Sequence, residues 1–271
     1  MNYTESKFDA KKHTLEFTLL LIVSTINSFS QNPEMVFVEG GTYNTAILKD
    51  FSIGKYEIMI KEYRDFCLAT KHEMPDELAY LLDENEWQNF EPHDLNHKRK
   101  NYEAVYGVSW YDAVAYCKWL SSVTGKKYRL PTELEWEYAA SGGTNTEKYL
   151  YSGNNILKKV GWSFQTIPKD TVVNPDNSLT VFIRNTTMEV GLLDANQLGL
   201  FDMSGNASEW CSNWYILPEN QINTEQEEFK VVRGGSKDDE DKYCEIASRY
   251  FLKPDDTTHK TGFRIVLSIN H

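Results

Sequence analysis

Positively charged residues are scarce in this sequence, and long apolar runs are missing. Lys and Arg number 28 against 40 Asp and Glu, which gives the 271 residues a formal net charge of −12 at pH 7. Binding along a nucleic-acid backbone requires clustered cations, so we expect no nucleic-acid partner. The longest apolar run, residues 17–26, is too short to cross a bilayer because a helix rises only about 1.5 Å per residue. We therefore expect no transmembrane segment.

Sequence patterns typical of repeat folds and of several enzyme classes are also missing. The sequence contains no repeat of solenoid or propeller length, no Ser-His-Asp order, no glycine-rich phosphate loop and no zinc-ligand spacing. His93 and His97 are four residues apart, a spacing that places two imidazoles on one face of a helix. Pro92 precedes them and no apolar periodicity surrounds them, so we interpret the pair as solvated surface residues.

The first 31 residues have the pattern of an export signal. Lys11 and Lys12 precede the apolar run, and small polar residues follow it, as in secretory signals. Glu16 beside the run is unusual for a signal, and a short N-terminal helix is the alternative. We expect residues 1–31 to be a signal peptide and residues 32–271 to form one domain. The protein would then be exported to the periplasm, the cell surface or the medium.

The remaining sequence is globular in composition. Apolar residues make up 41% of the chain and aromatic residues 13%, which predicts a core with many ring contacts. Alternating or β-branched stretches predict short strands over residues 35–43, 51–58, 229–233 and 262–267. Residues 76–104 and 144–190 lack regular periodicity, and we interpret them as surface excursions of the domain.

Three helices are predicted, two of them by their start signals. Apolar residues recur at helical spacing over residues 60–67. Ser109 followed by Asp112 resembles a capping box, although the last position normally carries Glu or Gln. Thr132 followed by Glu135 has the usual form of the same motif. Glycines follow both capped segments at positions that can end a helix.

Four segments, in this order, resemble motifs of the sulfatase-modifying-factor family, whose best-known activity is formylglycine generation. They are residues 108–120, residues 128–138, residues 199–210, and residues 233–236 together with 262–264. One such segment would be weak support, whereas four in sequence are specific. The resemblance implies an α+β protein with the formylglycine-generating-enzyme variant of the C-type lectin-like fold. That fold has small twisted antiparallel sheets, few helices and much irregular backbone.

The third of these segments is a candidate calcium site. Calcium prefers six to eight oxygen ligands from carboxylates, main-chain carbonyls and water. The resemblance places the side chains of Asp202 and Glu209 and the carbonyls of Gly205 and Ala207 on a structural calcium ion. Asp202 replaces the Asn of the enzyme, which adds negative charge and favours a cation. The alternative is an ordinary hydrogen-bonded turn with two solvated carboxylates.

The fourth segment bears on catalysis. In formylglycine-generating enzymes, two cysteines after a Gly-Gly-Ser motif bind copper, which activates oxygen to oxidise a cysteine of a client sulfatase. Here Cys244 matches the second cysteine and Asp239 replaces the first, with Ser236 as a supporting residue. Copper(I) is soft and prefers thiolates to carboxylates. We therefore expect a protein that acts by binding. The alternative is a formylglycine-generating oxidase whose atypical metal site uses Cys244 and Asp239, or a second cysteine brought in by a loop.

The four cysteines permit three complete pairings in an exported protein. Related domains often carry cysteines at the positions of Cys211 and Cys244, so the resemblance implies a disulfide between these two. Cys117 lies on the apolar stripe of its helix, and we interpret both it and Cys67 as small buried hydrophobic residues.

The resemblance also implies that the segment after Gly-Gly-Ser faces a ligand groove. In this sequence that segment carries four acids in a row, namely Asp238, Asp239, Glu240 and Asp241. Such a run would suit a basic or metal-bridged protein or peptide partner. A solvated acidic loop is the alternative.

Overall fold

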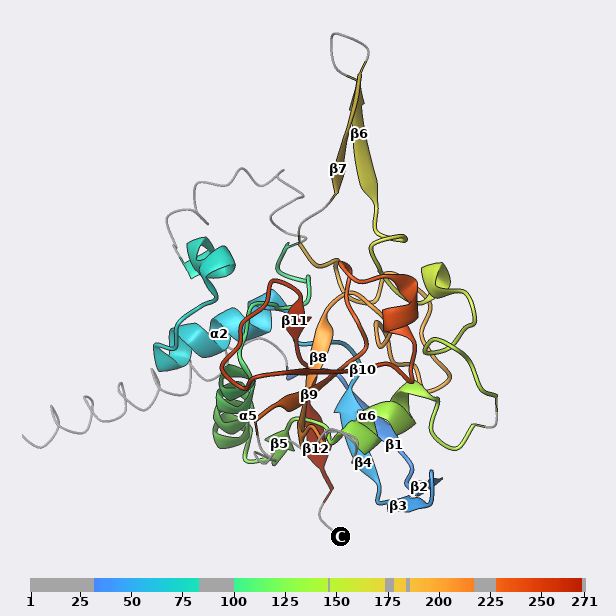
Figure 1. Cartoon of the computed structure of the whole chain (residues 1–271). Helices are drawn as coiled ribbons and strands as arrows, with labels where there is room; N and C mark the ends of the chain where they lie inside the picture. The colour runs from blue at the N-terminus through green and yellow to red at the C-terminus, as the bar shows by residue number, and fades with distance from the viewer. Residues whose placement is uncertain are drawn as a thin grey trace, which may run out of the picture. The chain divides into compact units, whose positions relative to one another are not determined.

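Strands that are far apart in the sequence lie side by side in the first sheet of the computed structural model (Figure 1). Its order is β1-β4-β12-β5, and every neighbouring pair is antiparallel. The bounds are β1 Met35–Val38, β4 Phe51–Gly54, β5 Tyr128–Arg129 and β12 Val266–Ser268. The strand near the C-terminal end of the sequence therefore lies between two strands from the first half of the chain.

The second sheet has the order β10-β9-β8-β11 and carries the segments that form the candidate site. Its strands are β8 Ser208–Trp214, β9 Lys230–Arg233, β10 Arg249–Leu252 and β11 Thr261–Gly262. β11 runs parallel to β8, with Thr261 opposite Ser208, whereas the other pairs are antiparallel. This pairing places the turn before β11 beside the start of β8.

The structure describes residues 32–82, 100–145, 147–173, 178–183, 186–216 and 228–269. The chain divides into two units, and Pro33–His271 is the second of them. The expected signal peptide, residues 1–31, and the His93–His97 pair lie outside the described residues, so both stay predictions. Among the described helices, none has the length and apolar character that crossing a membrane requires.

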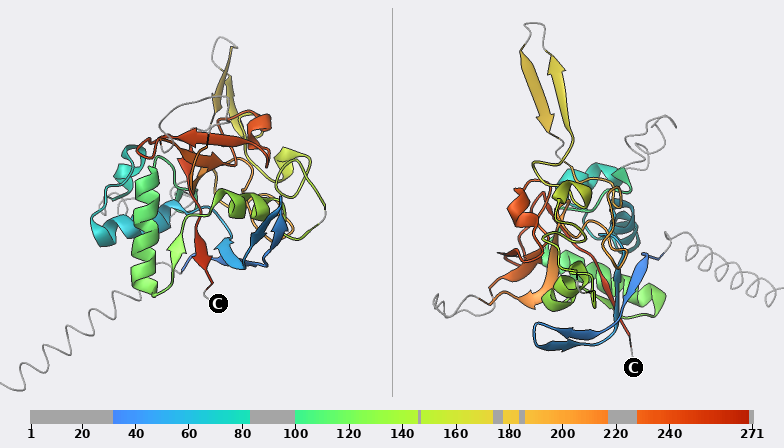
Figure 2. Two further views of the ribbon diagram at one scale, coloured as in Figure 1. Left: turned by 60° about the horizontal axis from the view of Figure 1, so that its bottom comes forward. Right: turned by 90° about the vertical axis from the view of Figure 1, so that its right-hand side faces the viewer.

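Two short antiparallel ribbons complete the strands. β2 (Gly41–Tyr43) pairs with β3 (Ala46–Leu48), and β6 (Lys169–Val173) pairs with β7 (Leu179–Ile183). The second ribbon projects away from both four-stranded sheets (Figure 2). The expected excursion over residues 144–190 therefore contains a hairpin as well as the short 3-10 helix η2, Leu157–Lys159.

The three predicted helices are present, and both predicted capping boxes are confirmed. The helices are α2 Ile60–Thr70, α5 Trp110–Thr124 and α6 Glu133–Ala140. At the start of α5, Ser109 N donates to Asp112 Oδ2 at 2.9 Å, and at the start of α6, Thr132 N donates to Glu135 Oε2 at 2.8 Å. Each carboxylate satisfies a donor that a helix start leaves without a partner. Two further 3-10 segments are η1 (Asp76–Leu82) and η3 (Asp241–Cys244).

The larger core cluster lies where α2 and α5 pack together. Tyr63 and Tyr116 are stacked at 6.2 Å between ring centroids, and Phe263 contacts both rings edge-on. Cys67 and Cys117 are buried in this cluster as expected, and burial raises the pKa of each thiol to about 12. Thiols with such a pKa are small apolar residues at neutral pH and not nucleophiles.

Candidate functional site

Two elements of the candidate site contact each other: the turn that precedes β8 and the loop that follows β9. Residues 202–207 form the turn, in which Asp202, Gly205 and Asn206 all have positive φ angles, of 55°, 88° and 65°. No other amino acid fits at position 205, because a Cβ there would lie 2.1 Å from the Trp162 carbonyl oxygen. Gly205 N also donates to Gly234 O at 2.8 Å, which ties the turn to the loop.

The Glu209 carboxylate is buried and bound on both oxygens. Arg264 Nε donates to Glu209 Oε2 and Arg264 Nη2 donates to Glu209 Oε1, each at 2.7 Å. Trp136 Nε1 also donates to Glu209 Oε2 at 2.7 Å. The bidentate guanidinium offsets part of the cost of burying this carboxylate.

Asp202 has a different environment. Its side chain is 2% exposed, and Oδ2 accepts a hydrogen bond from Gly191 N at 2.7 Å. Oδ1 is buried and has no hydrogen-bond partner among the described residues. Burial raises the pKa of Asp202 to about 6. A buried carboxylate oxygen without a partner carries a desolvation cost that a cation or a proton would remove.

A third buried carboxylate, Glu57, was missed by the sequence analysis. It is 1% exposed, accepts from Asn206 Nδ2 at 2.7 Å and accepts from Ala207 N at 2.8 Å. Burial, and then the charges of Asp202 and Glu209, raise its pKa well above the ordinary value. The only signal in the sequence was a single acid within an otherwise apolar stretch after β4.

These contacts show which of the expected calcium ligands could still bind an ion. Three buried carboxylates, Glu57, Asp202 and Glu209, share one guanidinium, that of Arg264, so the cluster has surplus negative charge when all are ionised. In the part of the chain that the structure describes, no group of three or more His, Cys, Asp or Glu residues is arranged to hold a metal ion. The side chain available to a cation is therefore Asp202, next to the carbonyls of the turn.

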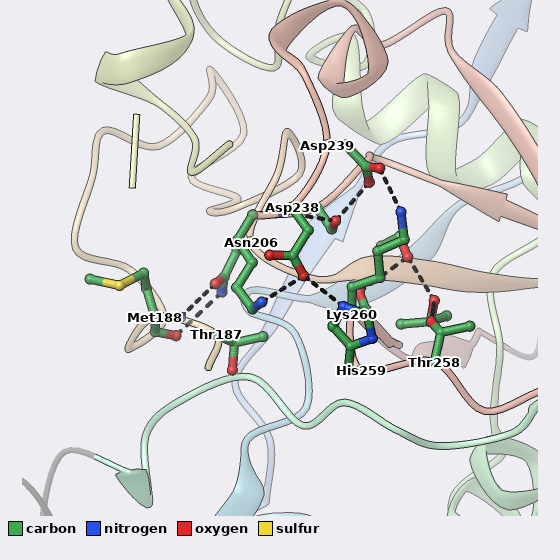
Figure 3. Close-up of polar contacts among 12 residues, drawn as sticks. Thr187, Met188, Asn206, Asp238, Asp239, Thr258, His259 and Lys260 are labelled. Carbon is green, nitrogen blue, oxygen red and sulfur yellow. Dashed lines mark hydrogen bonds and ion pairs between the residues drawn. The ribbon is translucent and has the colours of Figure 1, made fainter. Parts of the chain in front are cut away.

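Basic and hydroxyl side chains bind the acids of the run after Gly-Gly-Ser, and Figure 3 shows those around Asp238 and Asp239. Asp238 Oδ2 accepts from Lys237 Nζ at 2.6 Å and lies 3.3 Å from His259 Nε2. Asp239 accepts from Ser236 Oγ at 2.6 Å and from Lys260 Nζ at 2.5 Å.

The other two acids of the run are paired as well. Asp241 accepts from Ser163 Oγ at 2.5 Å, and Glu240 forms an ion pair with Lys242 at 2.8 Å. Glu240, with 59% of its side chain exposed, is the most open of the four acids. The run is therefore not a free negative surface, so a basic partner is not required by its charge.

Cys244 is a buried thiol beside this network. It is 0% exposed, and Sγ donates to the Ser236 carbonyl oxygen at 3.8 Å. Burial raises the pKa of the Cys244 thiol, and the carboxylates of Asp239 and Asp241 raise it further. Ser236 Oγ is directed to Asp239 and not to the sulfur. The site thus holds a protonated thiol and not a thiolate.

The expected Cys211–Cys244 disulfide is not formed, which corrects that prediction. All four cysteines lie in the described residues and are free thiols. Cys211 packs in the core cluster that contains Trp136, whereas Cys244 packs with Tyr151, Leu157 and Val160. The two thiols belong to separate packing clusters, and a disulfide requires the two Cβ atoms to be close together.

Residues 23–269 match the model of the sulfatase-modifying factor enzyme 1-like domain. This chain belongs to the sulfatase-modifying-factor family. It is 29% identical over 255 residues to the chaperone protein LppX of Paenibacillus barcinonensis, covering 78% of this chain and 81% of that protein. It is 34% identical over 179 residues to the formylglycine-generating enzyme of Thermomonospora curvata, covering 61% of this chain and 55% of that enzyme.

The family members differ in how much of their length this chain matches. The formylglycine-generating enzyme of Bos taurus is 33% identical over 187 residues, which cover 66% of this chain and 47% of the enzyme. The chain therefore spans about half the length of the two formylglycine-generating enzymes and most of the length of LppX.

Solved structures with low sequence identity to this chain have the same fold. Treponema denticola variable protein 1 superposes with a TM-score of 0.62 at 22% identity, covering 86% of this chain and 94% of that one. PvdO from Pseudomonas aeruginosa superposes with a TM-score of 0.60 at 21% identity, covering 88% and 95%. These neighbours confirm the expected α+β class and the formylglycine-generating-enzyme variant of the C-type lectin-like fold. Fold similarity at this identity says nothing about activity.

Proposed function

We propose that this sulfatase-modifying-factor domain is exported, is stabilised by calcium and acts by binding a protein or peptide. Copper-dependent oxidation is not part of the proposal. The single observation that carries it is the environment of Asp239, which replaces the first copper cysteine of the enzymes. Its carboxylate already binds the Ser236 hydroxyl and the Lys260 ammonium.

The residues present do not fit a copper(I) ion. Copper(I) prefers two facing thiolates, and this site has one thiol, Cys244, and one carboxylate, Asp239. Burial and the neighbouring carboxylates raise the Cys244 pKa, so binding a metal would first require an unfavourable deprotonation. Both chemical features oppose oxidase activity.

Calcium fits the 202–207 turn better than copper fits the Cys244 site. The Asp202 carboxylate and the carbonyls of Gly205 and Ala207 would hold the ion. Oδ1 of Asp202 has no hydrogen-bond partner in the described part of the chain, which supports this assignment. Glu209 would add negative charge while Arg264 and Trp136 bind its oxygens. The ion would neutralise surplus buried charge and would have a structural role.

A protein or peptide partner is supported by the relatives. The match to LppX, whose name describes a chaperone, extends over 81% of that protein, whereas the match to the bovine formylglycine-generating enzyme extends over 47%. The basic pattern and short apolar run of residues 1–31 support export. Binding residues lie disproportionately often on loops that a rigid scaffold holds in position.

The test is a conversion assay with the purified full-length protein. The protein is incubated with copper and a Cys-containing sulfatase peptide, and the peptide mass is followed for conversion of the thiol to the aldehyde. A formylglycine-generating enzyme with both copper cysteines serves as the positive control. We expect no conversion. Conversion by the wild type that Cys244→Ala abolishes would refute the proposal.

A further inference from the structure

An ion pair binds the residue that, by the sequence resemblance, replaces the first copper cysteine of the enzymes. Lys260 Nζ donates to Asp239 Oδ1 at 2.5 Å, and the pair joins the loop after β9 to the turn before β11 (Figure 3). The neighbouring residues Asp238 and His259 make a second contact between the same two segments, with 3.3 Å between Asp238 Oδ2 and His259 Nε2.

Main-chain hydrogen bonds hold both members of the pair in position. Phe164 N donates to the Asp239 carbonyl at 2.9 Å, and Asp239 N donates to the Ser236 carbonyl at 3.1 Å. Ser208 N donates to the Lys260 carbonyl at 2.9 Å, next to the parallel pairing of β8 and β11. The carboxylate is 14% exposed and the ammonium side chain 34% exposed. Backbone positions fixed in this way reduce the entropy lost when the two side chains pair.

We propose that the Lys260 ammonium is a covalently attached replacement for the copper ion of the enzymes and that it holds this loop over Cys244 without a metal. The inference rests on the proposed function and extends it, since it identifies what occupies the vacated metal position. A cuprous ion and an ammonium each carry one positive charge, and a thiolate and a carboxylate each carry one negative charge. The soft pair of Cu(I) and a cysteine thiolate is thus replaced by the hard pair of the Lys260 ammonium and the Asp239 carboxylate.

The proximity of the three groups supports this assignment. Lys260 binds the Asp239 carboxylate directly, and Asp239 is connected to Cys244 through Ser236. Ser236 makes the connection between Asp239 and Cys244, because its hydroxyl donates to the Asp239 carboxylate and its carbonyl accepts from the Cys244 thiol. Without the ammonium, the Ser236 hydroxyl would be the side chain that still binds the Asp239 carboxylate among the residues described, and the loop would open more often.

Thiol labelling tests whether the pair closes the loop. Wild type, Lys260→Met and the control Lys253→Met are treated with iodoacetamide under native conditions, and modification of Cys244 is followed by peptide mass. Lys253 is a suitable control because it pairs with Glu228 at 3.4 Å on an exposed surface. We expect Cys244 in Lys260→Met to react about five- to tenfold faster than in wild type, with no change in Lys253→Met. Equal rates in all three proteins would overturn the inference.

Copper binding tests whether the ammonium occupies the metal position. Asp239→Cys and Asp239→Cys/Lys260→Met are compared by competition for Cu(I) with bathocuproine disulfonate. We expect the double variant to bind at least about tenfold more tightly, because an unpaired ammonium beside the metal would repel it. Equal affinities would overturn the inference and leave the proposed function standing. Tight Cu(I) binding by the wild type would instead refute the proposed function.

Discussion

Arg264 and Glu209 form a fully buried ion pair with two parallel hydrogen bonds. The Glu209 carboxylate is 1% exposed, the Arg264 side chain is 0% exposed, and both N–O distances are 2.7 Å. Arg264 also donates to the carbonyls of Gly54 and Phe201, so one guanidinium connects the first sheet, the residue before the 202–207 turn and β8. The family motif that contains this arginine is therefore a structural connection between the two sheets.

Replacing Arg264 by Met should destabilise the protein strongly. The variant leaves Glu209 buried and uncompensated, and we expect a loss of about 3–5 kcal/mol in the free energy of unfolding. Arg129→Met is the matched control, because Arg129 pairs with Glu135 but is 39% exposed, and its loss should be about 1 kcal/mol. Urea denaturation of both variants measures the difference. Similar losses in the two proteins would contradict the structural role assigned to Arg264.

Asp202→Asn should stabilise the calcium-free protein at neutral pH. The folded-state pKa of Asp202, about 6, lies above the ordinary value of 3.8, so between these two values the folded state binds more protons than the unfolded state. The contribution of this group to stability therefore falls as pH rises from about 4 to about 6 and stays low above that. In EDTA we expect the variant to gain about 1–3 kcal/mol over wild type at pH 7 and little at pH 4. A difference that does not depend on pH would show that the carboxylate is not the cause.

Calcium should raise the thermal stability of the wild type. An ion that binds only the folded state adds about 2.7 kcal/mol to the free energy of unfolding at a hundredfold excess over its dissociation constant. Differential scanning calorimetry with calcium, with magnesium and with EDTA measures the shift. Asp202→Ala is the control, because it removes the buried oxygen for which the described residues provide no partner. An equal shift in this variant would place the ion elsewhere.

All four thiols should remain free in the purified protein. Cys244 and Cys211 lie in separate packing clusters, and neither side chain is exposed. Ellman's reagent should find almost no reactive thiol in the native protein and four per chain in denaturant. An intact mass two hydrogens lower, recovered from an oxidising compartment, would show instead that a disulfide forms.

The features that could be predicted from the sequence are those encoded locally or by motifs. Ser109 and Thr132 determine the starts of α5 and α6 through residues three positions away, so both capping boxes were predictable. Ordered motifs predicted the fold class, because a family shares its buried scaffold. Neither argument depends on which distant segments meet in space.

The features that could not be predicted depend on long-range contacts. Glu57 binds Asn206 and Ala207, which are 149 and 150 positions away, and Lys260 reaches Asp239 from 21 positions away. A run of acids looks like a free surface until its distant partners are known. The expected disulfide failed for a related reason, since cysteine positions in relatives do not fix the distance between two thiols here.

The position of β12 between β4 and β5 has a consequence for how a nascent chain matures. On the ribosome, β1, β4 and β5 emerge first, and their sheet lacks its third strand until β12 has been synthesised. During that interval β4 and β5 each present an unpaired edge, and such edges favour self-association. We infer that this chain folds late and slowly and needs protection from aggregation while it is being made.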